Sequence, residues 1–146
     1  MSFAYVIPKF LAQGSVPLDY DLRDRFDSVV LCAEEFQDVP LPGVEVIHAP
    51  FDDGGRAPTP AEAQIAWKAA KRVAKRVNAN KRVLVTCAMG LNRSGLVVGF
   101  VLIMLGFSAD QAIDIIRMAR PKALFNEHFV KLLKRVRPST SESATP

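Results

Sequence analysis

The chain has few cysteines, few histidines and no long apolar run, and each shortage excludes a class of protein. Cys32 and Cys87 are the only cysteines among its 146 residues, and His48 and His128 are the only histidines. Two cysteines are too few for a scaffold held together by disulfides. Two cysteines and two histidines also argue against a structural zinc site, so no metal is expected. The longest apolar run covers ten residues, 96–105, and is too short to span a bilayer.

Length and composition indicate one ordinary globular domain. Apolar residues make up 49% of the chain and charged residues 23%, which excludes a wholly disordered protein. The first residues lack a basic stretch followed by an apolar one, so no secretory signal is predicted and the expected location is the cytoplasm. We expect a monomer with one domain over residues 1–137 and a disordered tail, small and polar, over 138–146. The net charge of +4 suits a partner that carries phosphate but is weak evidence alone.

Short apolar runs alternate with helical patterns along the chain. Runs typical of buried strands occur at 26–33, 44–49 and 82–86, with two shorter ones at 5–7 and 10–13. Helices are marked by capping patterns at Thr59–Pro60 and Ser108, by an apolar stretch over 94–105, and by Asn126 before a last helix to 136. This alternation predicts an α/β fold: a mostly parallel central sheet of four to five strands with helices on both faces.

The segment most informative about function is VLVTCAMGLNRSG, residues 83–95, in which a strand leads through a short loop into a helix. Such a loop directs backbone N–H groups and the positive end of the helix dipole at one point. Cys87 at its start is a nucleophile whose thiolate form is favoured there, and Arg93 can present two N–H groups to an anion. Gly90 allows a sharp turn, and Ser94 places a hydroxyl near the sulfur. A Cys-x5-Arg pattern alone arises by chance, but with these neighbours it predicts covalent phosphoryl transfer through a cysteinyl-phosphate.

The pattern Cys87-x2-Gly90-x2-Arg93-Ser94-Gly95 resembles the signature of the cysteine-based protein phosphatases, in particular their small dual-specificity branch. The resemblance extends over nearly the whole chain. It implies a mostly parallel sheet, no cofactor, and Cys87, Arg93 and Ser94 as catalytic residues. It also implies a phosphate-binding loop made of Ala88, Met89, Gly90, Leu91, Asn92 and Arg93.

Such chemistry needs an acid to protonate the leaving oxygen. The segment 49–55 follows a strand and ends in two glycines, which suits a loop that carries an acid. In the family the acid typically stands three residues after a proline here, which corresponds to Asp53, with Asp52 as the alternative.

Two further positions bear on the mechanism. The family usually has a histidine before the nucleophile, and this chain has Thr86, which is expected to slow turnover without abolishing it. Several members of the superfamily protect the nucleophile by a disulfide to a second cysteine, and Cys32 is a possible redox partner of Cys87. The alternative is that Cys32 is simply a small buried strand residue.

These features predict a phosphomonoesterase that acts on phosphotyrosine in proteins or peptides, with phosphoserine and phosphothreonine left open. One alternative is an RNA 5′-triphosphatase, because the segment 90–95 also resembles the loop of that class; an acid at Asp53 argues against it. A phosphoinositide phosphatase ranks low because the loop contains no lysine. A phospho-binding module without turnover is supported only by Thr86. Nucleic acid is thus a possible but not a favoured partner.

Overall fold

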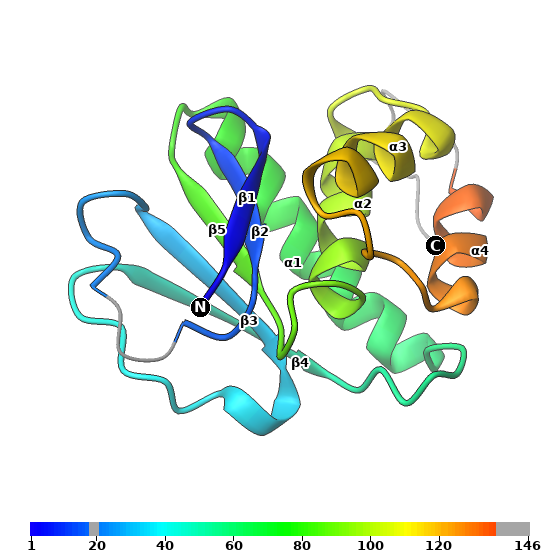
Figure 1. Ribbon diagram of the computed structural model, residues 1–146, viewed down its shortest axis with the longest axis horizontal. Helices are drawn as coiled ribbons and strands as arrows, with labels where there is room; N and C mark the ends of the chain where they lie inside the picture. Colours follow the sequence, from blue (N-terminus) through cyan, green and yellow to red (C-terminus); the bar gives the residue numbers. More distant parts are fainter. Residues whose placement is uncertain (18–20, 137–146) are drawn as a thin grey trace.

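The computed structural model describes residues 1–17 and 21–136 and contains one five-stranded sheet. Its strands are β1 (Phe3–Ile7), β2 (Leu11–Gly14), β3 (Ser28–Ala33), β4 (Glu45–Phe51) and β5 (Val83–Thr86). Their order is β1-β2-β5-β3-β4, and only β1 runs antiparallel to its neighbour. The predicted mostly parallel sheet is confirmed (Figure 1). The predicted tail, 138–146, and the domain boundary at 137 lie outside the described residues.

The helices begin and end close to the positions that the capping residues predict. They are α1 (Pro60–Asn78), α2 (Arg93–Met104), α3 (Ala109–Ala119) and α4 (Glu127–Arg135), with a short 3-10 helix, η1 (Glu34–Phe36), after β3. Capping boxes at Thr59 and Ser108 start α1 and α3, and the Asn126 side chain caps α4. Each cap supplies an acceptor to an N–H group that has no partner inside its helix, which fixes where the helix begins.

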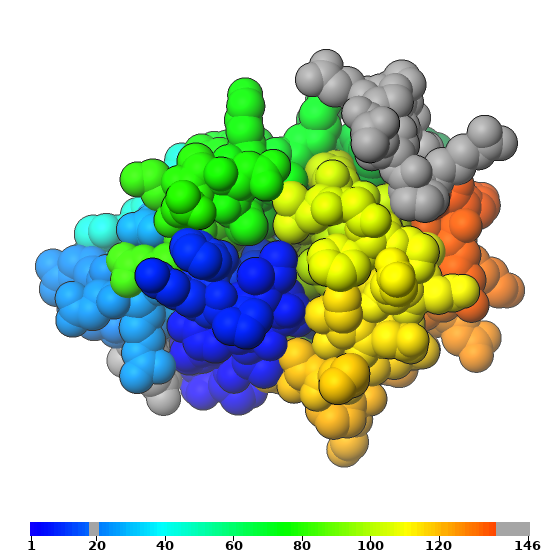
Figure 2. Space-filling view, turned by 90° about the horizontal axis from the view of Figure 1, so that it is seen from above, coloured from blue at the N-terminus to red at the C-terminus, as the bar shows by residue number. Residues whose placement is uncertain are grey.

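The distribution of helices differs from the sequence prediction, which placed them on both faces of the sheet. The α-helices contact one another through α2 and lie on one side of the sheet (Figure 1). The opposite face is covered by apolar side chains from the connections before and after β3, which include Leu22, Phe26 and Leu41. Aspartate and proline are frequent in these connections and oppose regular helix, so among the described residues they cover the sheet as loops. Seen from above, the N-terminal strands lie beside α3 (Figure 2).

The middle of the sheet positions the functional loop. All four residues of β5 are buried, and the strand lies between the parallel strands β2 and β3. The loop after β5 therefore leaves the carboxyl edge of the sheet between two neighbours, which is where open parallel sheets form their sites. No helix in the described part of the chain is long and apolar enough to cross a membrane.

Candidate active site

The loop between β5 and α2, residues 87–92, is held against the end of β2. The Cys87 N–H donates to the Gly14 carbonyl at 3.2 Å, which continues the pairing of the two strands. Gly90 has a φ of +73°, and a Cβ there would lie 2.3 Å from the Gly14 carbonyl carbon. Only glycine fits both this conformation and this contact, so Gly90 lets the loop turn tightly over the end of β2.

Cys87 lies at the amino end of α2, where the sequence analysis placed it. It is buried, and its Sγ atom lies 3.3 Å from the Oγ atom of Ser94 in the first turn of that helix. A hydroxyl at this distance can donate a hydrogen bond to a thiolate, and the helix dipole also favours negative charge there. Cys87 and Ser94 are therefore brought together as predicted.

Arg93 is buried and fixed by two partners. Its guanidinium forms a two-pronged ion pair with Glu35 of η1, with N–O distances of 2.6 and 2.8 Å, and donates to the Phe51 carbonyl at 3.2 Å. The pairing raises the pKa of Arg93 and lowers that of Glu35, in both cases chiefly through these hydrogen bonds. A planar cation held in this way faces the loop with little conformational freedom left to lose on binding an anion.

The two aspartates after β4 point to different partners. Asp53 accepts hydrogen bonds from the side-chain amides of Asn92, at 2.8 Å, and Asn126, at 2.7 Å. Asn92 belongs to the loop after Cys87, so Asp53 is tied directly to it. Asp52 instead approaches Arg56, at 3.6 Å, and is nearly half exposed. Asp53 is thus bonded to the loop that follows Cys87, whereas Asp52 pairs with Arg56.

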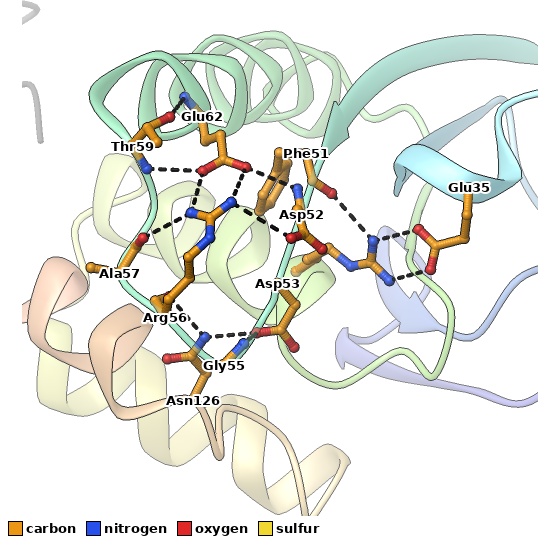
Figure 3. Close-up of polar contacts among 11 residues, drawn as sticks. Glu35, Phe51, Asp52, Asp53, Gly55, Arg56, Ala57, Thr59, Glu62 and Asn126 are labelled. Atoms are coloured by element: carbon orange, nitrogen blue, oxygen red, sulfur yellow. Dashed lines mark hydrogen bonds and ion pairs between the residues drawn. The ribbon is translucent and has the colours of Figure 1, made fainter.

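Glu62, at the start of α1, holds the segment that carries the aspartates. Its carboxylate accepts from the Asp52 and Thr59 backbone N–H groups and pairs with Arg56 (Figure 3). These hydrogen bonds, those from Arg56 first, lower the pKa of Glu62 to about 2. An unfolded glutamate titrates near 4.3, so the ionised form of Glu62 stabilises the fold.

Replacing Glu62 by glutamine is expected to lower the free energy of unfolding at pH 7 by roughly 1–3 kcal/mol. Because the pKa of Glu62 is lowered in the folded state, this contribution is present above about pH 4–5 and is lost as the pH falls towards 2. Urea unfolding at pH 7 and pH 3 measures the difference between the two proteins. It should shrink at the lower pH, whereas the exposed Asp114→Asn control should change little at either. A Glu62→Gln difference that stays constant with pH would contradict this role.

Thr86 does not take the place of the family's histidine in organising the loop. Its side chain is buried, and its hydroxyl donates to the Val30 carbonyl of β3 at 2.8 Å. This bond joins two neighbouring strands rather than supporting the loop after Cys87. The loop must therefore be held by other side chains.

Cys32 lies at the end of β3, beside Cys87. The register of β3 and β5 pairs Leu31 with Thr86, and the residue that follows each of these two is a cysteine. Both thiols are free, and Cys32 is fully buried. Burial, and next the neighbouring Cys87, raise the pKa of Cys32 well above its usual range. Burial thus favours the thiol form of Cys32 over its thiolate.

Several site residues were missed by the sequence analysis because they come from distant segments. Two of them, Glu35 and Asn126, have just been described as partners of Arg93 and Asp53. Arg120, after α3, donates to the Met89 carbonyl at 3.0 Å. The available clue was position: Glu35 directly follows a parallel strand, whose carboxyl end lies at the site edge. In the described part of the chain no group of three or more metal-ligating side chains occurs.

A thiol at the end of a central parallel strand, followed by a tight loop and a fixed arginine, is the arrangement typical of cysteine-based phosphatases. A family model described as "Dual specificity phosphatase, catalytic domain" matches residues 23–138, and the chain belongs to this family.

Relatives and solved structures agree with this assignment. The chain is 30% identical over 112 residues to mouse "Protein tyrosine phosphatase type IVA 2", and 31% identical over the same length to the human type IVA 3 protein. Each match covers 75% of this chain but only 65% and 63% of the relatives, so the chain spans less than two thirds of their length. The crystal structure of "Tk-PTP in the active form" superposes with a TM-score of 0.71 at 28% identity, over 91% of this chain and 96% of that one. DUSP15 shares the fold, with a TM-score of 0.74 at 20% identity over 90% of this chain and 85% of its own.

Proposed function

We propose that the protein hydrolyses phosphotyrosine in proteins or peptides through a cysteinyl-phosphate on Cys87. The observation that carries this proposal is the convergence of three groups on one loop: the Cys87 thiol, the fixed Arg93 guanidinium and the Asp53 carboxyl tied to Asn92. A nucleophile, an anion clamp and a proton donor are the groups that phosphoryl transfer through an enzyme intermediate requires.

In the first step the Cys87 thiolate attacks phosphorus. The P–S bond forms while the P–O bond to the substrate breaks, and the leaving oxygen takes the proton of Asp53. Arg93 and the N–H groups of the loop neutralise the charge on the three equatorial oxygens, where it is spread in the transition state. The ion pair with Glu35 keeps the Arg93 guanidinium in the orientation needed to bind these oxygens.

In the second step water attacks phosphorus and the P–S bond breaks. The Asp53 carboxylate, left ionised by the first step, takes a proton from the water, and inorganic phosphate leaves. The Ser94 hydroxyl, 3.3 Å from Sγ, donates a hydrogen bond to the departing thiolate and so stabilises it. The residues named here account for both steps without a cofactor.

The rim of the loop supports an aromatic substrate. The backbone N–H of Leu124 donates to the Leu91 carbonyl, and that of Asn126 donates to the Asn92 side chain. Phe125, between them, is therefore fixed beside the loop, and the residue is 63% exposed. Met89 in the loop is 66% exposed. Exposed apolar side chains on and beside the loop suit the phenyl ring of phosphotyrosine.

A substrate panel tests the proposed function. It compares a phosphotyrosine peptide, a phosphoserine peptide, a triphosphate-ended RNA and a soluble phosphoinositide, with phosphate release as the measurement. The highest kcat/KM is expected for the phosphotyrosine peptide. A higher value for the RNA or the phosphoinositide would overturn the assigned substrate, and no release from any of the four would support a phospho-binding module instead.

Mild peroxide is expected to inactivate the enzyme reversibly by forming a Cys32–Cys87 disulfide. A thiolate is the species that peroxide attacks, and the strand register places Cys32 beside it. Neighbouring strands lie about 5 Å apart, and a disulfide needs Cα atoms within about 7 Å. Mass mapping of the oxidised protein should show the linked peptides, and a thiol reductant should restore the activity.

The Cys32→Ser variant is the matched control for this oxidation. Without a partner, the sulfenic acid on Cys87 is expected to oxidise further to sulfinic acid, which reductant does not reverse. Equal recovery of the wild-type protein and Cys32→Ser would show that Cys32 is an ordinary packed residue.

A further inference from the structure

Gln13 is a fully buried polar side chain in β2, and it contacts the loop after Cys87. Its amide nitrogen donates to the Gly90 carbonyl at 3.1 Å and approaches the Leu91 carbonyl at 3.4 Å. Its amide oxygen has no hydrogen-bond partner among residues 1–17 and 21–136. A buried polar atom without a partner lowers the stability of the fold, and β2 is otherwise a short apolar strand. An apolar residue would therefore suit the fold better here, which points to a role for Gln13 at the loop.

The loop carbonyls are occupied one after another by donors from other parts of the molecule. The Ala88 carbonyl accepts from the Val16 N–H at 3.4 Å, and the Met89 carbonyl accepts from Arg120 at 3.0 Å. The Leu91 carbonyl accepts from the Leu124 N–H at 3.1 Å. Among the described residues, Gln13 is the one donor to the Gly90 carbonyl.

The orientation of these carbonyls decides what the loop offers an anion. Each peptide carries its C=O and the following N–H on opposite sides, so a carbonyl held from outside turns the next N–H towards the centre of the loop. A carbonyl released from its donor can rotate, and its negative end then faces the anion instead. The peptide between Gly90 and Leu91 is the one most exposed to this change, because glycine adds little barrier to rotation.

We propose that Gln13 is a positioning residue of the phosphate-binding loop, which turns the Gly90–Leu91 peptide so that its N–H faces the bound phosphate. This role rests on the proposed function of the loop. Gln13 then gives the loop the support that Thr86 does not give, because the Thr86 hydroxyl is bonded to Val30. The unpartnered amide oxygen is then a local cost to stability that the site retains for phosphate binding.

The Gln13→Leu variant separates this role from a structural one. Leucine keeps a similar volume but cannot donate to the Gly90 carbonyl. We expect tungstate, a tetrahedral oxyanion, to bind about tenfold more weakly by titration calorimetry, as the loss of roughly one net hydrogen bond implies. The unpartnered oxygen disappears while the Gly90 carbonyl loses its donor, so the melting temperature should stay within roughly 4 °C of that of the wild type.

Two further variants keep the test decisive. Gln13→Glu replaces the donor by a carboxylate and should weaken tungstate binding at least as much as Gln13→Leu. Ser28→Ala removes another buried polar side chain of the sheet, in β3, whose hydroxyl bonds to Glu45 rather than to the loop; it should leave tungstate binding unchanged. If Gln13→Leu does not fold, Gln13→Glu and Gln13→Met are measured in the same way.

Unchanged tungstate affinity in the Gln13 variants would overturn the proposal, and so would an equal loss in Ser28→Ala. Anion binding is measured without turnover, so the result does not depend on which substrate the enzyme hydrolyses. A wild-type protein that binds tungstate but hydrolyses none of the panel substrates would reject the proposed function and still allow the role of Gln13 to be tested.

Discussion

Replacing Cys87 by serine is expected to lower kcat by at least roughly 10³-fold while leaving oxyanion binding largely intact. Serine retains the size of the side chain but is a far weaker nucleophile, so the P–S intermediate cannot form. The Arg93 guanidinium, still paired with Glu35, and the loop N–H groups remain to bind the anion. Phosphate release from a phosphotyrosine peptide measures the first effect, and calorimetric titration with tungstate measures the second.

Cys32→Ser is the matched control, because it changes the other buried cysteine on the neighbouring strand. Under reducing conditions it should retain most of the activity. More than a few percent of wild-type activity in Cys87→Ser would contradict a covalent mechanism. Loss of tungstate binding in Cys87→Ser would show that the thiol also holds the loop in shape.

The elements of the fold were predictable where their causes are local. Thr59 and Ser108 start helices because each offers an oxygen to an N–H three residues later, a pattern visible in the sequence. The strands β3 and β5 stand out as continuous apolar runs because both of their faces are covered. The distribution of helices was not predictable in the same way. It depends on whether the segments around Leu22 and Leu41 cover the sheet as loops or as helices, and both would place apolar side chains inward.

In the site, too, the residues that lie close together in the sequence were predictable and the contacts between distant residues were not. Cys87, Gly90, Arg93 and Ser94 lie within eight residues, so one strand–loop–helix motif predicts their meeting. The contacts that orient them join residues far apart: Glu35 and Arg93 are 58 positions apart, and Gln13 and Gly90 are 77. A single sequence contains no measure of which distant side chain reaches a given loop. Supporting residues of this kind emerge only once the strand order is known.

Replacing Asp53 by asparagine is expected to lower kcat by roughly 10²–10⁴-fold on a substrate with a poor leaving group. Asparagine fills the same space and can still bond to Asn126 or Asn92, but it has no proton to give to the leaving oxygen. An activated aryl phosphate leaves without much protonation, so its rate should fall much less. The measurement is kcat for a series of aryl phosphates whose leaving groups differ in basicity, and the slope against leaving-group pKa should become steeper in the variant.

Asp52→Asn is the matched control for this substitution. Asp52 is the adjacent carboxylate, but it pairs with Arg56, whereas the loop residue Asn92 bonds to Asp53. It should therefore keep the wild-type slope and most of the rate. A steeper slope in Asp52→Asn than in Asp53→Asn would transfer the role of acid to Asp52. An unchanged slope in both variants would mean that neither aspartate gives the leaving oxygen its proton.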